Sequence, residues 1–289
     1  MAQEKLKLHA YPKLISPRLI MGFSGWMNGG EVSLGTIDYL VKKFKAQKLA
    51  DIDPSGFYLY SFPGSMELTA LFRPHTAIRE GIVEEYSPPA NSFYFDQGND
   101  LIYFSGKEPN LAWEEYGDAV FSLCKYYAVD QICFIGSVSG LTPHSREPRI
   151  TFSCSDENTR ENLLEHGLKP SDYEGPASIV SYLTFRARQE NISLTVLVAE
   201  IPAYIKGFNP RCIETMTRLI GNLYELHFVV GDLHGAVEAF DSKIKETLEK
   251  EAEFAEKVKQ LEQQYDSEAF DREMTDLESW FRERGFQFE

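Results

Sequence analysis

Basic residues, closely spaced cysteines and long apolar runs are all scarce in this chain of 289 residues. Its 29 Lys and Arg are outnumbered by 44 Asp and Glu, which gives a formal net charge of −15. Nucleic acids and anionic membranes attract clustered positive charge, so this balance opposes both kinds of partner. No stretch approaches the roughly 20 apolar residues of a membrane span, and the polar N-terminus lacks a signal-peptide pattern. We expect a cytoplasmic protein that binds neither nucleic acid nor membrane.

The cysteines have no spacing typical of a metal or redox site. None belongs to a C-x-x-C pair, which excludes zinc ribbons and thioredoxin-like chemistry. Their neighbours are largely apolar, a setting typical of buried, reduced thiols. The residues concerned are Cys124, Cys133, Cys154 and Cys212.

A second group of residues that could bind a metal lies at a predicted strand-to-helix junction. His227, Asp232 and His234 could be drawn as a metal set, but no further nearby ligand fixes a coordination geometry. Asp232 lies where a helix is expected to begin, and aspartate is a good N-cap there. We therefore expect a helix cap and no bound metal.

Hydrophobic residues make up 43% of the chain and aromatic residues 13%, enough to build a large core. Short apolar runs alternate with amphipathic segments, as in βαβ units with a mostly parallel sheet and helices on both faces. The predicted strands are Arg18–Phe23, Leu101–Phe104, Gln131–Ile135 and Ser193–Ile201. The predicted helices run from Val32 to Phe44, Trp113 to Tyr127, Ala177 to Gln189 and Pro210 to Tyr224.

Two regions depart from this alternation. Between Phe57 and Phe95, alternating aromatic residues broken by prolines predict antiparallel strands or an excursion at a sheet edge. From about Gly235 the chain is rich in Glu and Lys around a sparse apolar stripe, which predicts a long helix or a helical hairpin. We therefore divide the chain into an α/β domain, residues 1–234, and an acidic C-terminal helical extension, residues 235–289. The extension can pack on its own domain or between subunits.

Ligands of open parallel sheets bind beyond the carboxyl ends of the strands. Four loops follow the predicted strands there, and a fifth segment enters a helix nearby. Together they contain the residues that we predict to form a pocket or an interface: Trp26, Asn28, Gly30, Glu31, Glu108, His144, Arg146, Tyr173, Glu174 and Tyr204.

The sequence of these loops does not match three common catalytic or cofactor-binding motifs. The glycines between Gly22 and Gly30 have the wrong spacing for a dinucleotide site, and Gly106-Lys107-Glu108 ends in a carboxylate that would repel phosphate. In the segment 136–140, Val138 stands where a nucleophile elbow needs serine. We assign no catalytic residue, no metal and no cofactor.

Two residues of these loops have open interpretations. His144 is the best general acid–base candidate, and the neighbouring Arg146 would lower its pKa. Alternatively, both side chains bond loop carbonyls or a carboxylate of a neighbouring subunit. Trp26, in a glycine-rich loop, can line a pocket or anchor a partner.

Five pieces of these loops, in the same order, resemble the proteasome-assembly-chaperone-2 family, over roughly Leu19 to Leu261. They are Gly25-Trp26 with Asn28, Gly30 and Glu31; Gly106-x-Glu108-Pro109 with Trp113; Gly136 followed by Pro143-His144-x-Arg146; Tyr173-Glu174-Gly175-Pro176; and Glu200-Ile201-Pro202-x-Tyr204 with Pro210.

The resemblance implies a three-layer α/β domain with the topology of purine nucleoside phosphorylases but without their catalytic residues. It also implies homo-oligomers, commonly trimers, and in some relatives a role in proteasome assembly. Some prokaryotic relatives have been labelled ATP-grasp or carboxylate–amine ligases, but this chain lacks the metal-binding carboxylates of that class. Met27 stands where the family usually has Asn. The ending Gln287-Phe288-Glu289 lacks the hydrophobic-Tyr-x motif by which some relatives dock on proteasomes, so we do not expect docking by that route.

We therefore predict a non-catalytic, oligomeric scaffold or assembly chaperone that binds a protein partner. The alternatives are a hydrolase or transferase acting on a small nucleoside-like ligand, and a sensor that binds such a ligand without reaction. An enzyme needs Glu108, His144, Arg146 and Tyr204 to converge on one point. A scaffold needs the same loops, Trp26 included, in subunit contacts or on an exposed apolar patch.

Overall fold

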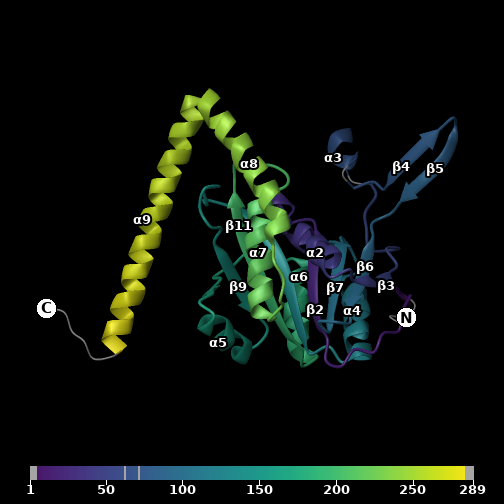
Figure 1. Cartoon of the computed structure of the whole chain (residues 1–289). Coiled ribbons are helices and arrows are strands. Elements are labelled where there is room, and N and C mark those ends of the chain that lie inside the picture. The colour runs from purple at the N-terminus through teal and green to yellow at the C-terminus, as the bar shows by residue number, and fades with distance from the viewer. Residues whose placement is uncertain (1–4, 62, 71, 284–289) are drawn as a thin grey trace.

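The computed structural model describes residues 5–61, 63–70 and 72–283 (Figure 1). The strands are β1 Leu6–Leu8, β2 Arg18–Ser24, β3 Gln47–Ile52, β4 His75–Arg79, β5 Ile82–Ser87, β6 Asn91–Asp96, β7 Leu101–Lys107, β8 Gln131–Gly140, β9 Ile150–Cys154, β10 Lys169–Pro170 and β11 Ser193–Pro202. The helices are η1 Gly29–Glu31 (a 3-10 turn), α2 Val32–Lys43, α3 Met66–Ala70, α4 Trp113–Tyr127, α5 Glu157–Glu165, α6 Ile179–Gln189, α7 Pro210–Leu223, α8 Gly231–Lys250 and α9 Ala252–Glu283.

Within those ranges, one sheet has the strand order β1-β3-β6-β7-β2-β8-β11-β9-β10. Its centre is parallel, because β2 pairs in parallel with β7 and β8, and β8 does so with β11. The flanks begin with antiparallel pairs, β6 on β7 at one side and β9 on β11 at the other. The carboxyl ends of the four central strands therefore share one edge of the sheet.

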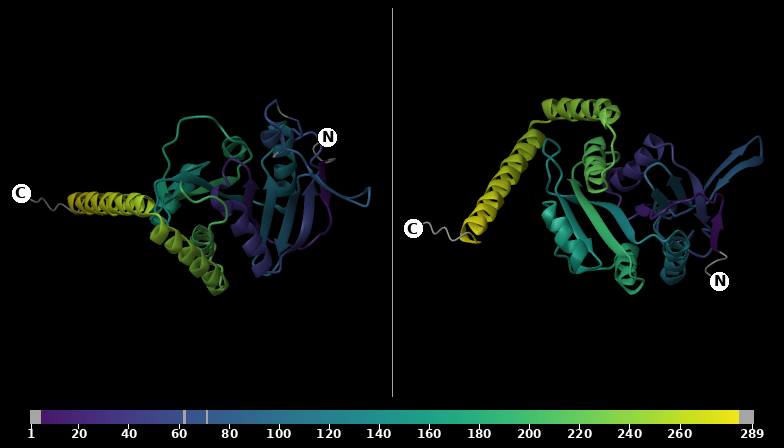
Figure 2. Two further views of the ribbon diagram at one scale, coloured as in Figure 1. Left: turned by 90° about the horizontal axis from the view of Figure 1, so that it is seen from above. Right: turned by 60° about the horizontal axis from the view of Figure 1, so that its bottom comes forward.

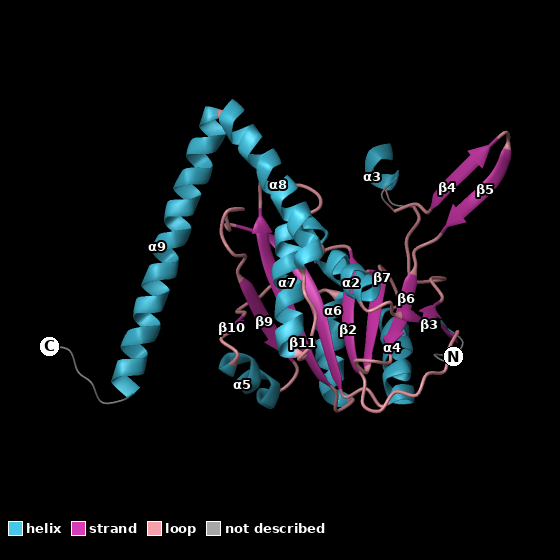
Figure 3. Cartoon of the chain, in the orientation of Figure 1, coloured by secondary structure: helices cyan, strands magenta, loops and turns pink. Residues whose placement is uncertain are grey.

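Helices cover both faces of this sheet (Figure 3). Side chains of a strand alternate between faces, so Leu19 and Met21 of β2 pack with α4 and α6, whereas Ile20 packs with α2 and α7. The predicted α/β fold with a layered, helix-covered sheet is confirmed. The purine nucleoside phosphorylase topology stays a prediction.

Helix α2 lies unusually close to β2 because Gly22 has no side chain. A Cβ atom at this position would come within 2.8 Å of the carbonyl oxygen of Ser33. The Ser33 hydroxyl accepts a hydrogen bond from the amide of Phe23 at 3.1 Å and donates one to the carbonyl of Ile135 at 2.5 Å. This buried bridge fixes α2 against β2 and β8, and with it the glycine-rich loop that enters the helix.

The antiparallel strands predicted between Phe57 and Phe95 are confirmed. Strand β6 joins the main sheet, whereas β4 and β5 form a separate two-stranded sheet. We call residues 75–87 the β4–β5 arm. All views show it projecting from one side of the molecule, with α9 on the other side (Figures 1 and 2).

The C-terminal residues form two long helices, α8 and α9, joined at a sharp corner. Val237 and Ile244 of α8 and Val258 of α9 are buried. Helix α8 begins at Gly231, and the division into residues 1–234 and 235–289 stays a prediction. The ending Gln287-Phe288-Glu289 lies outside the described residues.

Three predicted core thiols, Cys124, Cys133 and Cys212, are free and buried, and Cys154 is free and half-buried. Burial raises the pKa of Cys124, Cys133 and Cys212 to about 12 in each case, so these thiols are poor nucleophiles. In the described part of the chain, none of the helices has the length and apolar character needed to span a bilayer.

Candidate functional site

Glu108 joins the loops that follow β2 and β7. Its carboxylate accepts a hydrogen bond from the backbone amide of Trp26 at 2.8 Å, and its own amide donates to Ser24 O at 2.8 Å. Gly25 makes this approach possible, because its φ is +141° and a Cβ atom there would lie 2.7 Å from the Glu108 side chain. Glu108 therefore has a structural role, while the Trp26 side chain is left 73% exposed.

Asn28, Gly30 and Glu31 shape the backbone of the glycine-rich loop. The Asn28 side-chain oxygen accepts from the amide of Leu34 at 3.2 Å, in the first turn of α2. Gly30 and Glu31 both have left-handed backbone angles, with φ of 61° and 58°. The Gly30 carbonyl accepts from the amide of Asn209 at 2.8 Å, so this loop is also tied to the loop after β11.

His144 and Tyr204 form a partly buried pair above β8 and β11. The Tyr204 hydroxyl oxygen lies 2.8 Å from both the backbone amide and Nδ1 of His144. The amide donates to this oxygen, and the hydroxyl can donate to Nδ1, which leaves the ring proton of a neutral imidazole on Nε2.

The pKa of His144 is lowered, as predicted from Arg146, but the main cause differs. Burial disfavours the charged imidazolium most, and the guanidinium groups of Arg211 and Arg146 add smaller contributions. Glu262 and Asp241 act in the opposite direction.

The loop between β8 and β9 is bonded to α9 of the same chain. Arg146 forms a bidentate ion pair with Asp266, and Ser145 donates to the carboxylate of Glu262. Farther along the loop, Arg149 lies 2.8 Å from a carboxylate oxygen of Glu268 and stacks 4.3 Å from the ring centre of Tyr265. The C-terminal helices were expected to pack either on their own domain or between subunits. In these contacts they pack on their own domain.

Tyr173 and Glu174 lie on an exposed turn before α6. The Tyr173 hydroxyl donates to the carbonyl of Pro176 at 3.1 Å, within the same turn. Nothing in the described contacts joins these two residues to Glu108, His144 or Arg146.

The candidate residues thus divide into two groups on one edge of the sheet. Trp26 and Glu108 lie above β2 and β7, whereas His144, Tyr204 and Arg146 lie above β8 and β11 and contact the C-terminal helices. Glu108, His144 and Arg146 each bind a different partner. His144 Nε2 can still exchange a proton, but the charged groups of Glu108 and Arg146 are engaged in structural bonds.

Among the described residues, no group of three or more His, Cys, Asp or Glu side chains could hold a metal ion. Asp232 is bonded to the Tyr39 hydroxyl at 2.5 Å and to Lys43 Nζ at 3.0 Å. The helix-cap prediction for Asp232 is wrong, because the N-cap of α8 is Val230 and Asp232 lies in the first turn.

Sequence reasoning missed two asparagines that support this edge. Asn209 caps α7, accepting from the amide of Cys212 at 3.1 Å, and Pro210 occupies the first turn. An Asn-Pro pair before an amphipathic segment is a known cap signal and could have found it. Asn91 is buried under the Glu108 loop, where its side-chain oxygen lies 2.8 Å and 3.0 Å from the hydroxyls of Tyr58 and Tyr116. No sequence signal marks Asn91.

Fold and edge together define a layered α/β protein whose strand-end loops are tied by structural bonds and carry exposed aromatic side chains. The chain belongs to the PAC2 family, since the family model matches residues 22–248. The family predicted from the loop motifs is thereby confirmed. Among curated proteins, none matches the chain significantly.

Several solved structures share the fold. A Mycobacterium tuberculosis protein of unknown function has a TM-score of 0.81 at 21% identity, covering 94% of this chain and 92% of that one. A proteasome-assembly chaperone homologue of the same organism has a TM-score of 0.71 at 23% identity, with coverages of 83% and 98%. PbaB of Pyrococcus furiosus, an archaeal proteasome activator, has a TM-score of 0.63 at 16% identity, with coverages of 84% and 97%.

Proposed function

We propose that this chain is a non-catalytic, assembly-chaperone-like scaffold that forms a homo-oligomer, with three copies favoured, and binds a protein partner. Family membership supports the role, since its structural relatives include a proteasome-assembly chaperone homologue and a proteasome activator. The trimer follows from the family resemblance.

The observation that carries the proposal is the apolar surface of the β4–β5 arm. Ile78 and Val83 face each other across the two strands, and both are exposed, as are Ile82 and Tyr86. An isolated two-stranded hairpin is marginally stable in water, and exposed apolar patches mark interaction surfaces. A second copy of the chain is the occupant that we assign to the arm, because closed homo-oligomers reuse one surface on every subunit.

The carboxyl edge of the sheet supplies a second apolar surface, which we assign to the protein partner. Each of the four loops after the central strands exposes a large apolar side chain, while the polar candidates beside them are bonded within the chain. The exposed residues are Trp26, Leu111, Leu141 and Phe208. Aromatic residues at such places are frequent anchors of protein interfaces.

The enzyme and sensor alternatives need a nucleoside-like ligand held at the same edge. The enzyme requires Glu108, His144, Arg146 and Tyr204 to converge on one point. His144 and Tyr204 bond each other, whereas Glu108 and Arg146 bind partners elsewhere. The geometry therefore favours the scaffold.

Affinity capture from the host lysate, with small molecules retained for analysis, tests the partner surface. Wild type should retain one dominant protein partner, and Trp26→Ala should lose it. The control is Tyr126→Ala, which removes an exposed aromatic side chain near the end of α4, at the opposite edge of the sheet. An unchanged partner in Trp26→Ala, or capture of a small molecule in place of a protein, would contradict the proposal.

A further inference from the structure

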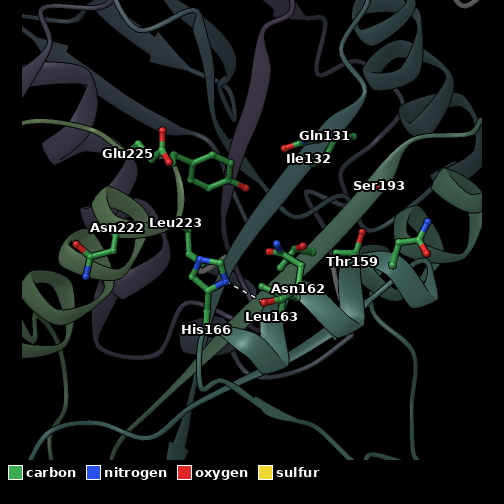
Figure 4. A pocket seen from close by; sticks show the side chains of 13 residues that line it. Gln131, Ile132, Thr159, Asn162, Leu163, His166, Ser193, Asn222, Leu223 and Glu225 are labelled. Carbon is green, nitrogen blue, oxygen red and sulfur yellow. Dashed lines mark hydrogen bonds between the residues drawn. The ribbon is translucent and has the colours of Figure 1, made fainter.

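A polar recess of about 440 Å³ lies at the amino edge of the sheet, where β8 and β11 begin (Figure 4). It is bounded by these strand ends, by α5 and by the end of α7. This edge is opposite to the loops that carry Trp26 and His144, and the proposed scaffold function does not use it.

The floor of the recess is formed by one face of the sheet, where the side chains change from apolar to polar toward the strand starts. Cys133 of β8 and Leu197 of β11 are buried on the face covered by α7. Two-residue steps along the same face lead back to Gln131 on β8 and to Thr195 and Ser193 on β11. These three polar side chains line the recess, so an apolar core face ends in a hydrogen-bonding floor.

One wall is a polar stripe of α5. Asn158, Asn162 and His166 are spaced four residues apart, which places them on one helix face, and all three line the recess. His166 Nδ1 lies 2.8 Å from the carbonyl oxygen of Asn162. A carbonyl only accepts, so Nδ1 donates, and the second ring nitrogen points toward the wall that contains Asn222 and Leu223 (Figure 4).

The opposite wall comes from the end of α7. Asn222 adds a fourth amide side chain to those of Gln131, Asn158 and Asn162, and Glu225, in a left-handed conformation with φ of 55°, adds a carboxylate. Leu163 and Leu223 supply apolar surface on the two sides.

We propose that this recess binds a small, neutral, polyhydroxylated molecule of the sugar or cyclitol class. Amide and hydroxyl side chains both donate and accept, which matches a ring of hydroxyl groups, and the leucines can cover its C–H face. None of the described lining residues is Lys or Arg, and the carboxylate of Glu225 repels anions, so phosphorylated or carboxylated ligands do not fit. The volume lies in the range of small-molecule sites, about 300–1,000 Å³.

Saturation-transfer NMR on the full chain tests this site with myo-inositol and D-glucose as neutral probes and with glucose 6-phosphate as an anionic one. The neutral probes should give signals and the anionic probe none. Asn162→Leu removes one amide but keeps the backbone carbonyl that orients His166, and it should weaken binding about tenfold. Glu225→Gln should leave folding intact and admit glucose 6-phosphate.

The matched control is Gln189→Leu, an exposed amide at the end of α6 and outside the recess lining. It should bind the neutral probes as wild type does. Absence of signal from both neutral probes, equal binding by Asn162→Leu and wild type, or binding of glucose 6-phosphate alone to the wild type would overturn the proposal.

Discussion

Arg146 and Asp266, which are 120 residues apart in the chain, form a bidentate ion pair with Nε–Oδ1 and Nη2–Oδ2 distances of 2.8 Å each. Such planar pairs fix geometry as well as charge. The pair attaches the first part of α9 to the loop between β8 and β9. A residue that could have polarised a ligand instead positions the C-terminal helices.

Arg146→Ala should release α9 from this loop. Backbone amides of residues 252–268 should exchange hydrogen about two- to fivefold faster, while the global unfolding free energy changes little, because partly exposed pairs contribute weakly to it. Lys257→Ala is the matched control, since Lys257 pairs with Glu253 within α9 at 2.6 Å. Equal exchange in Arg146→Ala and wild type would mean that the ion pair does not hold the helix.

Acid should weaken the same contact. The hydrogen bonds from Arg146 lower the pKa of Asp266 below its ordinary value of 3.8 in the docked state. The carboxylate of the released state has the ordinary pKa of 3.8, so it takes up its proton at a higher pH than the docked carboxylate does. The ion pair therefore stabilises docking fully above pH 3.8, and this stabilisation is lost as pH falls through the lowered pKa of Asp266. Hydrogen exchange of α9 should therefore accelerate in this acid range for wild type. Asp266→Asn should show faster exchange already at neutral pH and a smaller acid effect.

His144 should make stability depend on pH in a higher range. Burial lowers its pKa from the ordinary 6.5, so the unfolded chain binds this proton more readily than the folded one. Its contribution to the unfolding free energy is complete above 6.5 and is lost as pH falls from 6.5 toward the lowered pKa. Urea unfolding across this range should show that slope in wild type and a reduced slope in His144→Gln. An NMR titration that places the His144 pKa at or above 6.5 would refute this prediction.

Gly22→Ala should destabilise the fold by about 2–3 kcal/mol, because its methyl group would overlap a backbone oxygen of α2, which cannot turn aside, and a buried side chain of the same helix. The nearest atoms are Ser33 O and Ile37 Cγ1, each 2.8 Å from the added Cβ. Gly235→Ala, on α8, is the control, since a Cβ atom there meets nothing within 4 Å. It should be neutral or stabilise the chain by up to about 1 kcal/mol. Similar unfolding midpoints for the two variants would contradict the close packing of α2.

The periodicity of apolar residues in the sequence was sufficient to predict the layers of the fold. Apolar runs such as Arg18–Phe23 and Ser193–Ile201 became buried strands, because side chains buried on both sheet faces leave a continuous apolar signature. The antiparallel strands at the two sides of the sheet were harder to predict from the sequence. Strand β9 pairs with β11 through only five residues, and its short sequence carries no clear alternation.

The sequence predicted where the candidate site residues lie, but not which groups they bond. Adjacent parallel strands bring Trp26, Glu108, His144 and Tyr204 to one edge, which topology alone requires. The partners of these side chains come from distant segments, as with Asp266 for Arg146, and no spacing rule connects residues so far apart. The antiparallel strands of the β4–β5 arm were predicted, but their exposed apolar side chains were not, because exposure depends on what the surrounding chain covers.

The solution mass of the full chain, measured by light scattering over a range of concentrations, tests the oligomeric scaffold most directly. Wild type should have three times the 33.0 kDa chain mass, and Ile82→Glu, which puts a charge on the β4–β5 arm, should be monomeric. Ile15→Glu, at a 92% exposed position outside the arm, should assemble as wild type does. A monomeric wild type, or an Ile82→Glu variant with the mass of wild type, would contradict assembly through the arm.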